Sequence, residues 1–143
     1  MTLALAIDLG GTKVEAALVD EDGSLIEGSR HRAPTGAAAA SDVTVLADAL
    51  EAVIAACRTH PRWGEVAAAG IGSAGPVDIS AGTIAPINLP AAHGFDIVSA
   101  VRAASGLDAA HLRLDGTCIA LAEAWLGAAR GVRNAIIFVV STG

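Results

Sequence analysis

The sequence has no tyrosine, only two cysteines and no uninterrupted apolar run long enough to cross a membrane. A membrane-spanning helix needs about 20 consecutive apolar residues, whereas the apolar 53% of this chain is largely alanine and valine spread along its length. The apolar run over 3–9 contains Asp8 and lacks a basic flank, unlike a signal peptide. These absences predict a soluble, cytoplasmic protein with no membrane partner.

Basic residues are also few, and they are not clustered. Nine Lys and Arg against 15 Asp and Glu give a net charge of −6, so a nucleic-acid backbone would find no positive patch to bind. Cys57 and Cys118 each lie in a helix-like apolar pattern, which favours buried free thiols over a disulfide or a metal cluster. We therefore expect no nucleic-acid partner and no metal held by cysteine.

Hydrophobic spacing predicts a β-meander followed by helices that alternate with strands. The predicted strands cover 3–9, 13–18, 25–32, 66–71, 83–87, 111–114 and 135–140, and the predicted helices cover 41–58, 95–105 and 116–129. Such an order indicates an α/β fold, with a mixed sheet that starts as a meander and is flanked by helices. Ligands in such sheets bind where loops leave the carboxyl ends of the strands.

The strongest chemical signal is the run Asp8-Leu9-Gly10-Gly11-Thr12-Lys13 between the first two predicted strands. Two glycines let backbone N–H groups approach a phosphate, Thr12 adds a hydroxyl donor, and Asp8 can hold a hydrated Mg²⁺. The spacing is neither that of a P-loop nor that of a dinucleotide-binding fold. From the residues alone, an ordinary glycine hairpin with an exposed Asp and Lys is an equally good interpretation.

Three further features carry chemical groups, and each also has a purely structural interpretation. The small-residue loop at 70–78 either makes room for a ligand or simply ends a strand. Asn88, in Asn88-Leu89-Pro90, suits a polyol because an amide both donates and accepts, but Asn before Pro also starts turns. Asp115 stands between a strand and a helix, where Asp is commonly an N-cap.

In this order, together with the segment 122–128 (Ala-Glu-Ala-Trp-Leu-Gly-Ala), these motifs resemble the ROK family (repressors, open reading frames, kinases) along essentially the whole chain. The resemblance implies a ribonuclease H-like lobe of the actin-like ATPase superfamily. It implies glucokinase-like transfer of the ATP γ-phosphoryl group, with Mg²⁺, to a hexose or an N-acetylhexosamine. Residues 1–130 would form the N-terminal lobe, and 131–143 the first strand of a truncated nucleotide lobe. Any structural zinc would lie beyond residue 143, and a homodimer is left open.

The resemblance also assigns roles to individual residues. Asp115 matches the catalytic base that accepts the proton of the sugar hydroxyl. Phosphate or Mg²⁺ binding falls to Asp8, Gly10, Gly11, Thr12, Lys13, Thr142 and Gly143. Sugar binding falls to Ser73, Ala74, Gly75 and Asn88.

Three departures from the family pattern bear on activity. Leu114 and Thr117 stand where family kinases usually have Asn, and Ala74 stands where they usually have Pro. The interpretation as a weak or degenerate kinase therefore stays open. Two other interpretations are a sugar-sensing transcriptional regulator, which in this family carries a helix-turn-helix ahead of the first strand, and a noncatalytic sugar-binding module.

Overall fold

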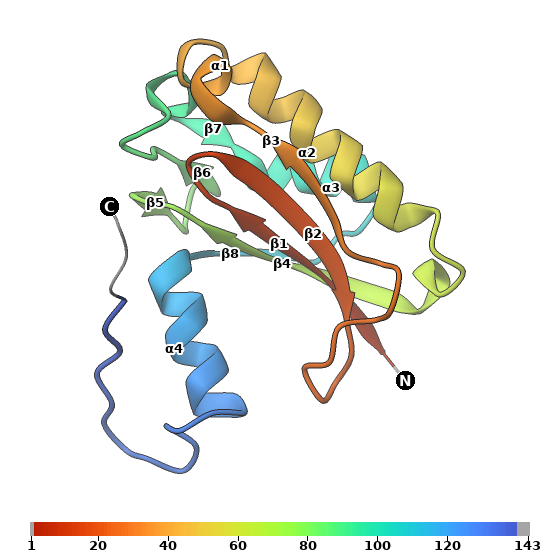
Figure 1. The fold of residues 1–143 in the computed structure, drawn as a ribbon, viewed down its shortest axis with the longest axis vertical. Coiled ribbons are helices and arrows are strands. Elements are labelled where there is room, and N and C mark those ends of the chain that lie inside the picture. Colours follow the sequence, from red (N-terminus) through yellow and green to blue (C-terminus); the bar gives the residue numbers. More distant parts are fainter. Residues whose placement is uncertain (1, 140–143) are drawn as a thin grey trace.

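The structure, a computed structural model, describes residues 2–139. A twisted five-stranded sheet forms its centre, with two long helices on one face and the last helix on the other (Figure 1). The strands are β1 (Leu3–Leu9), β2 (Lys13–Val19), β3 (His31–Pro34), β4 (Val66–Ser73), β5 (Val77–Asp78), β6 (Thr83–Ile84), β7 (Phe95–Asp96) and β8 (Ala110–Leu114). The α-helices are α1 (Gly36–Ser41), α2 (Val43–Arg58), α3 (Ile97–Ser105) and α4 (Asp115–Trp125), and two 3₁₀ turns are η1 (Trp63–Glu65) and η2 (Pro90–Ala92).

The order of strands in the main sheet is β3-β2-β1-β4-β8. β1 pairs antiparallel with β2 and parallel with β4, and β4 pairs parallel with β8. The carboxyl ends of β1, β4 and β8 therefore meet at one edge, where ligands bind in sheets of this kind. The expected α/β fold with a mixed sheet and a meander at its start is confirmed.

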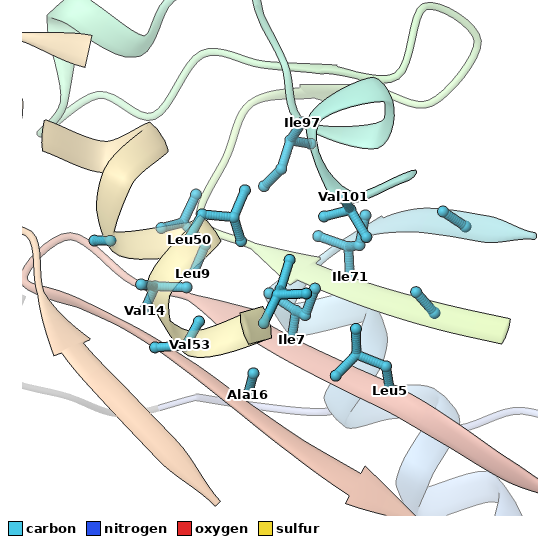
Figure 2. Close-up of a cluster of buried hydrophobic side chains, with 14 of the residues drawn as sticks. Leu5, Ile7, Leu9, Val14, Ala16, Leu50, Val53, Ile71, Ile97 and Val101 are labelled. Atoms are coloured by element: carbon cyan, nitrogen blue, oxygen red, sulfur yellow. The ribbon is translucent and has the colours of Figure 1, made fainter. Parts of the chain in front are cut away.

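The hydrophobic core lies between this sheet and the helices α2 and α3 (Figure 2). Alternate side chains of β1, namely Leu5, Ile7 and Leu9, are almost completely buried on this face. Leu50 and Val53 of α2 pack onto them at helical spacing. Burying a side chain of this size contributes about 1.5–3 kcal/mol relative to leaving it exposed, so this layer holds the strands in register.

On the opposite face of the sheet, β1 and β4 contribute mainly small residues. Ala6 of β1 pairs with Gly70 of β4, and two residues along, on the same face, Asp8 pairs with Gly72. Helix α4 lies on this side and contacts β4 and β8 (Figure 1). No residue of α4 is buried, and its apolar side chains Ile119, Leu121 and Trp125 are 42%, 55% and 50% exposed. Small residues below and a loosely packed helix above leave a hollow between them.

The ends of α2 and α3 follow the signals in the sequence. Oδ1 of Asp42 accepts a hydrogen bond from the Thr44 N–H at 2.9 Å, which makes Asp42 the N-cap of α2. Asp96 caps α3 in the same way through the Ser99 N–H, so this helix begins two residues later than the predicted 95. Gly106, in the left-handed conformation at φ 76°, ends it as predicted.

Two predicted strands are wrong in the described part of the chain. Residues 25–30 form a turn and one isolated bridge, because Gly28 takes a positive φ of 76° and the Ser29 hydroxyl, in place of a backbone carbonyl, accepts the Leu18 N–H. β3 therefore starts only at His31. Residues 135–139 are irregular and pair with no strand among residues 2–139, and the predicted residue 140 lies outside the described residues.

Two smaller differences concern helix and strand length. The alanine-rich stretch at 37–40, for which no helix is expected, forms the short helix α1. The strand expected over 83–87 ends at Ile84, because Pro86 follows and cannot donate a backbone hydrogen bond. Within residues 2–139, no helix combines the length and the apolar character needed to span a bilayer.

Candidate active site

The predicted phosphate hairpin forms the turn between β1 and β2. Register pairs Leu9 with Val14, and the Gly10 N–H donates to the Lys13 carbonyl at 3.0 Å across the turn. The Thr12 carbonyl accepts the N–H groups of Thr35 and Gly36, at 2.9 and 3.2 Å, which ties the turn to the start of α1. The hairpin is thus fixed by backbone bonds from both sides.

Asp8 and Asp115 open into the same cavity. Asp8 projects from the small-residue face of β1, and Asp115 follows the carboxyl end of β8. Both line a cavity of about 650 Å³ under α4, whose floor includes Gly72 and whose helix wall includes Cys118. The hollow between the sheet and α4 therefore joins the hairpin strand to the predicted base.

Negative charge accumulates around Asp8. Partial desolvation raises the pKa of the Asp8 carboxyl above its ordinary value, and repulsion from Glu15 and Asp115 raises it further, while Lys13 opposes the shift. A cation placed here would be stabilised by these carboxylates. Mg²⁺ bound through one or two carboxylates and phosphate oxygens fits this donor set. No group of three or more metal-ligating side chains occurs among residues 2–139.

Lys13 does not extend freely into solvent. Its Nζ lies 2.5 Å from Oε2 of Glu15, a side chain that is only 11% exposed. Nη2 of Arg30 lies 2.9 Å from Oε1 of the same carboxylate, and Nε of Arg32 lies 3.7 Å from it. Hydrogen bonds from Lys13 and Arg30 hold the pKa of Glu15 below its ordinary value. Glu15 thus anchors three cations beside the hairpin.

Sequence reasoning missed Glu15. The available signal was a charged residue at a position of β2 that pairs directly with Asp8, because like charges opposite each other in a sheet need compensating cations. Arg30 lies in a turn whose path the hydrophobic pattern did not reveal, so its contact with Glu15 could not be predicted.

Asp115 is placed differently from the expectation in one respect. The N-cap of α4 is Leu114, and Asp115 is already the first helical residue. Its Oδ1 accepts the N–H of Gly116 at 2.6 Å and makes no capping bond further along the helix. The carboxylate thus remains in the first turn of α4.

The loop after β4 is bonded to the same edge. Ser73 is fully buried and its hydroxyl donates to the Ala74 carbonyl at 2.9 Å, so this side chain is closed to solvent. The Ala74 N–H donates to the Leu9 carbonyl at 2.9 Å, next to the hairpin. A Cβ at Gly75 would overlap the Leu114 side chain, so the loop packs directly against the residue before Asp115.

Asn88 contacts the hairpin at Gly11. It is exposed, and its amide occupies the place where a Cβ on Gly11 would stand. The structure therefore gathers the hairpin, the 73–75 loop, Asn88 and Asp115 at one edge of the sheet. The predicted phosphate-binding residues Thr142 and Gly143 lie outside the described residues.

Comparison with known proteins points to one family. The family model described as "ROK family" matches residues 4–143. The glucokinase of Streptomyces coelicolor is 33% identical over 144 residues, which cover 100% of this chain and 42% of that enzyme. The N-acetylmannosamine kinase of Yersinia pseudotuberculosis is 37% identical over 123 residues, covering 86% of this chain and 39% of that enzyme.

Solved structures show the same fold. A ROK family glucokinase from Streptomyces griseus, in complex with glucose and AMPPNP, superposes with a TM-score of 0.74 at 28% identity, over 90% of this chain and 38% of that one. A ROK family transcriptional regulator superposes with a TM-score of 0.68 at 18% identity, over 85% of this chain and 30% of that one, which shows a shared fold alone. This chain spans about 42% of the length of the curated glucokinase it matches. From the matched residues and the shared fold together, we conclude that the chain belongs to the ROK family.

Proposed function

We propose that the complete protein containing this chain transfers the γ-phosphoryl group of ATP to a hydroxyl of a hexose or an N-acetylhexosamine. The observation that carries the proposal is that Asp8 and Asp115 open into one cavity. The named activities of the relatives, glucokinase and N-acetylmannosamine kinase, support this reaction class. The glucose and AMPPNP in the Streptomyces griseus structure support sugar and ATP as its ligands.

In this reaction the residues divide into a donor side and an acceptor side. The hairpin backbone around Gly11, with the Thr12 hydroxyl, would hold the phosphates. Asp115 would accept the proton of the attacking sugar hydroxyl while that oxygen bonds to the γ-phosphorus and the bond to the leaving ADP oxygen breaks. Because the transition state is loose, alignment and charge neutralisation matter more than a strong base.

Asp8 is the residue that would hold Mg²⁺ against the phosphates. When bound, the ion neutralises charge that develops on the phosphate oxygens. Lys13, held on Glu15, contributes a fixed positive charge on the same side. The small side chains of the 73–75 loop would leave space for the sugar, and Asn88 would bind its hydroxyl groups.

The test is a coupled ADP-release assay on the complete protein across hexoses and N-acetylhexosamines. We expect ADP release that depends on at least one of these sugars. A flat response across the panel would instead favour a sugar-sensing regulator or a noncatalytic module. The 143-residue chain alone is expected to show little turnover, because one lobe cannot align ATP with the sugar.

A further inference from the structure

The contact between Gly11 and Asn88 joins the two sides of the candidate site. A Cβ built on Gly11 would overlap Nδ2 of Asn88 and would lie 2.7 Å from its Cγ. Gly11 is not among the glycines with positive φ. An alanine could therefore adopt this backbone conformation, and the obstacle to a side chain at position 11 is the Asn88 amide.

Both ends of this contact are fixed. The hairpin is bonded through the Thr12 carbonyl to the first residue of α1, and α1 packs against η2, the turn that follows Asn88. Leu89 is fully buried, and its N–H donates to the Pro86 carbonyl at 3.0 Å. The backbone of Asn88 is thus held while its side chain points out over the hairpin.

The Asn88 amide is also free to bind a ligand. Among the hydrogen bonds of residues 2–139, none involves the Asn88 side chain. A primary amide has two donor and two acceptor positions. One side of this group is covered by Gly11, so its orientation toward an acceptor depends on what occupies position 11.

We propose that Gly11, a residue of the donor hairpin, determines how the acceptor sugar is held, because the missing side chain lets the Asn88 amide lie directly over its Cα. This inference rests on the proposed sugar kinase function. It predicts that a methyl group added to the phosphate hairpin weakens sugar binding by displacing Asn88. The donor and acceptor sites are coupled through this contact.

A double-mutant cycle in the complete protein tests the coupling. Gly11→Ala, Asn88→Ala and the double variant are compared by acceptor KM and by the rise in Tm that the sugar alone produces. Gly64→Ala is the matched control, because a Cβ there would meet no atom within 4 Å and because Gly64 lies in η1, outside the candidate site. Asn88→Gln lengthens the side chain at position 88, which crowds the same contact without altering the hairpin.

We expect Gly11→Ala to raise the acceptor KM about fivefold to twentyfold, as loss of one or two ligand hydrogen bonds would. The double variant should match Asn88→Ala within about twofold, since no amide remains to be displaced. Gly64→Ala should leave the acceptor KM unchanged, and Asn88→Gln should raise it. Independent, multiplying effects of Gly11→Ala and Asn88→Ala, or an effect of Gly11→Ala on the nucleotide KM alone, would overturn the inference.

Failure of the proposed function would look different. If no sugar is phosphorylated but a sugar still raises the Tm, the kinase proposal fails and the cycle is evaluated on the Tm shifts. If no sugar raises the Tm of the unmodified protein, the coupling inference fails as well. The Tm of Gly11→Ala without sugar reports folding, and if it falls steeply, Asn88→Gln alone decides the outcome.

Discussion

The thiol of Cys118 lies over the Cα of Gly72, with Sγ 3.3 Å from the position that a Cβ on this glycine would take. Cys118 is one turn along α4 from Asp115, and Gly72 pairs with Asp8 on the neighbouring strand. The thiol therefore sits between the two carboxylates, and both of them raise its pKa, after the larger effect of desolvation.

Cys118 should serve as a chemical reporter of the cavity. In the complete protein at about pH 8, we expect iodoacetamide to label Cys118 faster than Cys57, whose thiol is buried with its pKa raised to about 11. Asp115→Asn removes a charge that disfavours the thiolate, so labelling should accelerate, by less than the roughly tenfold of a full pKa unit. Mass spectrometry of the labelled peptides measures both rates. Equal labelling of the two cysteines would contradict the placement of Cys118.

Asp115→Asn should lower kcat by about 10²–10⁴, because the variant cannot accept the hydroxyl proton. The isosteric amide keeps the helix start, so the Tm should change little. Asp108→Asn is the control, since Asp108 is an exposed carboxylate before the other end of β8. A kcat for Asp115→Asn within threefold of that of the unmodified protein would contradict the proposed role of Asp115 as base.

Asp8→Asn should lower activity and, near neutral pH, stabilise the fold. The folded-state pKa of Asp8 is raised above its ordinary value of 3.8, so its contribution to the free energy of unfolding is fully present below that value and is lost as pH rises through the folded pKa. The gain in the free energy of unfolding for Asp8→Asn should therefore be present at pH 7 and vanish below about pH 3.8. Urea unfolding at both pH values measures it, and a pH-independent difference would count against the charge cluster.

Glu15→Gln should destabilise the fold by about 1–2 kcal/mol at pH 7, because it leaves Lys13 and Arg30 without their shared carboxylate. The pKa of Glu15 is lowered in the folded state from an ordinary 4.5. The contribution of Glu15 to the free energy of unfolding is thus complete above pH 4.5 and is lost as pH falls through its folded-state pKa. The destabilisation caused by Glu15→Gln should therefore become smaller in acid, and urea unfolding at both pH values measures it.

The matched control is Glu51→Gln, an exposed carboxylate on α2. It should change the free energy of unfolding by less than about 0.5 kcal/mol, as is usual for surface positions. If the two Glu→Gln variants behaved alike, the network around Glu15 would carry no stability.

Local patterns predicted the fold well where they were strong. The apolar run of β1, the N-cap at Asp42 and the left-handed glycine at Gly106 each specify structure within a few residues, and all three are found. The strand expected over 25–32 was wrong because a single hydroxyl, that of Ser29, replaces a backbone partner. Hydrophobic spacing does not reveal where a side-chain hydroxyl takes the place of a backbone hydrogen-bond partner.

The candidate site was predictable in outline only. Parallel strands bring their carboxyl ends together, so the approach of the hairpin strand to Asp115 followed from the order of elements. The contact between Asn88 and Gly11 depends on the path of a loop more than 70 residues away along the chain, where no local rule applies. Catalytic roles of the residues gathered here stay predictions.

The apolar side chains of helix α4 are not confined to one face of the helix, and no residue of the helix is buried. Handled as a separate 143-residue polypeptide, the molecule would present Leu121, Trp125 and Leu126 to water together. Surfaces of that kind drive aggregation. Light scattering by preparations of the 143-residue chain should therefore rise with protein concentration. A weak signal in a kinase assay on these preparations would then reflect aggregation rather than the chemistry of the site.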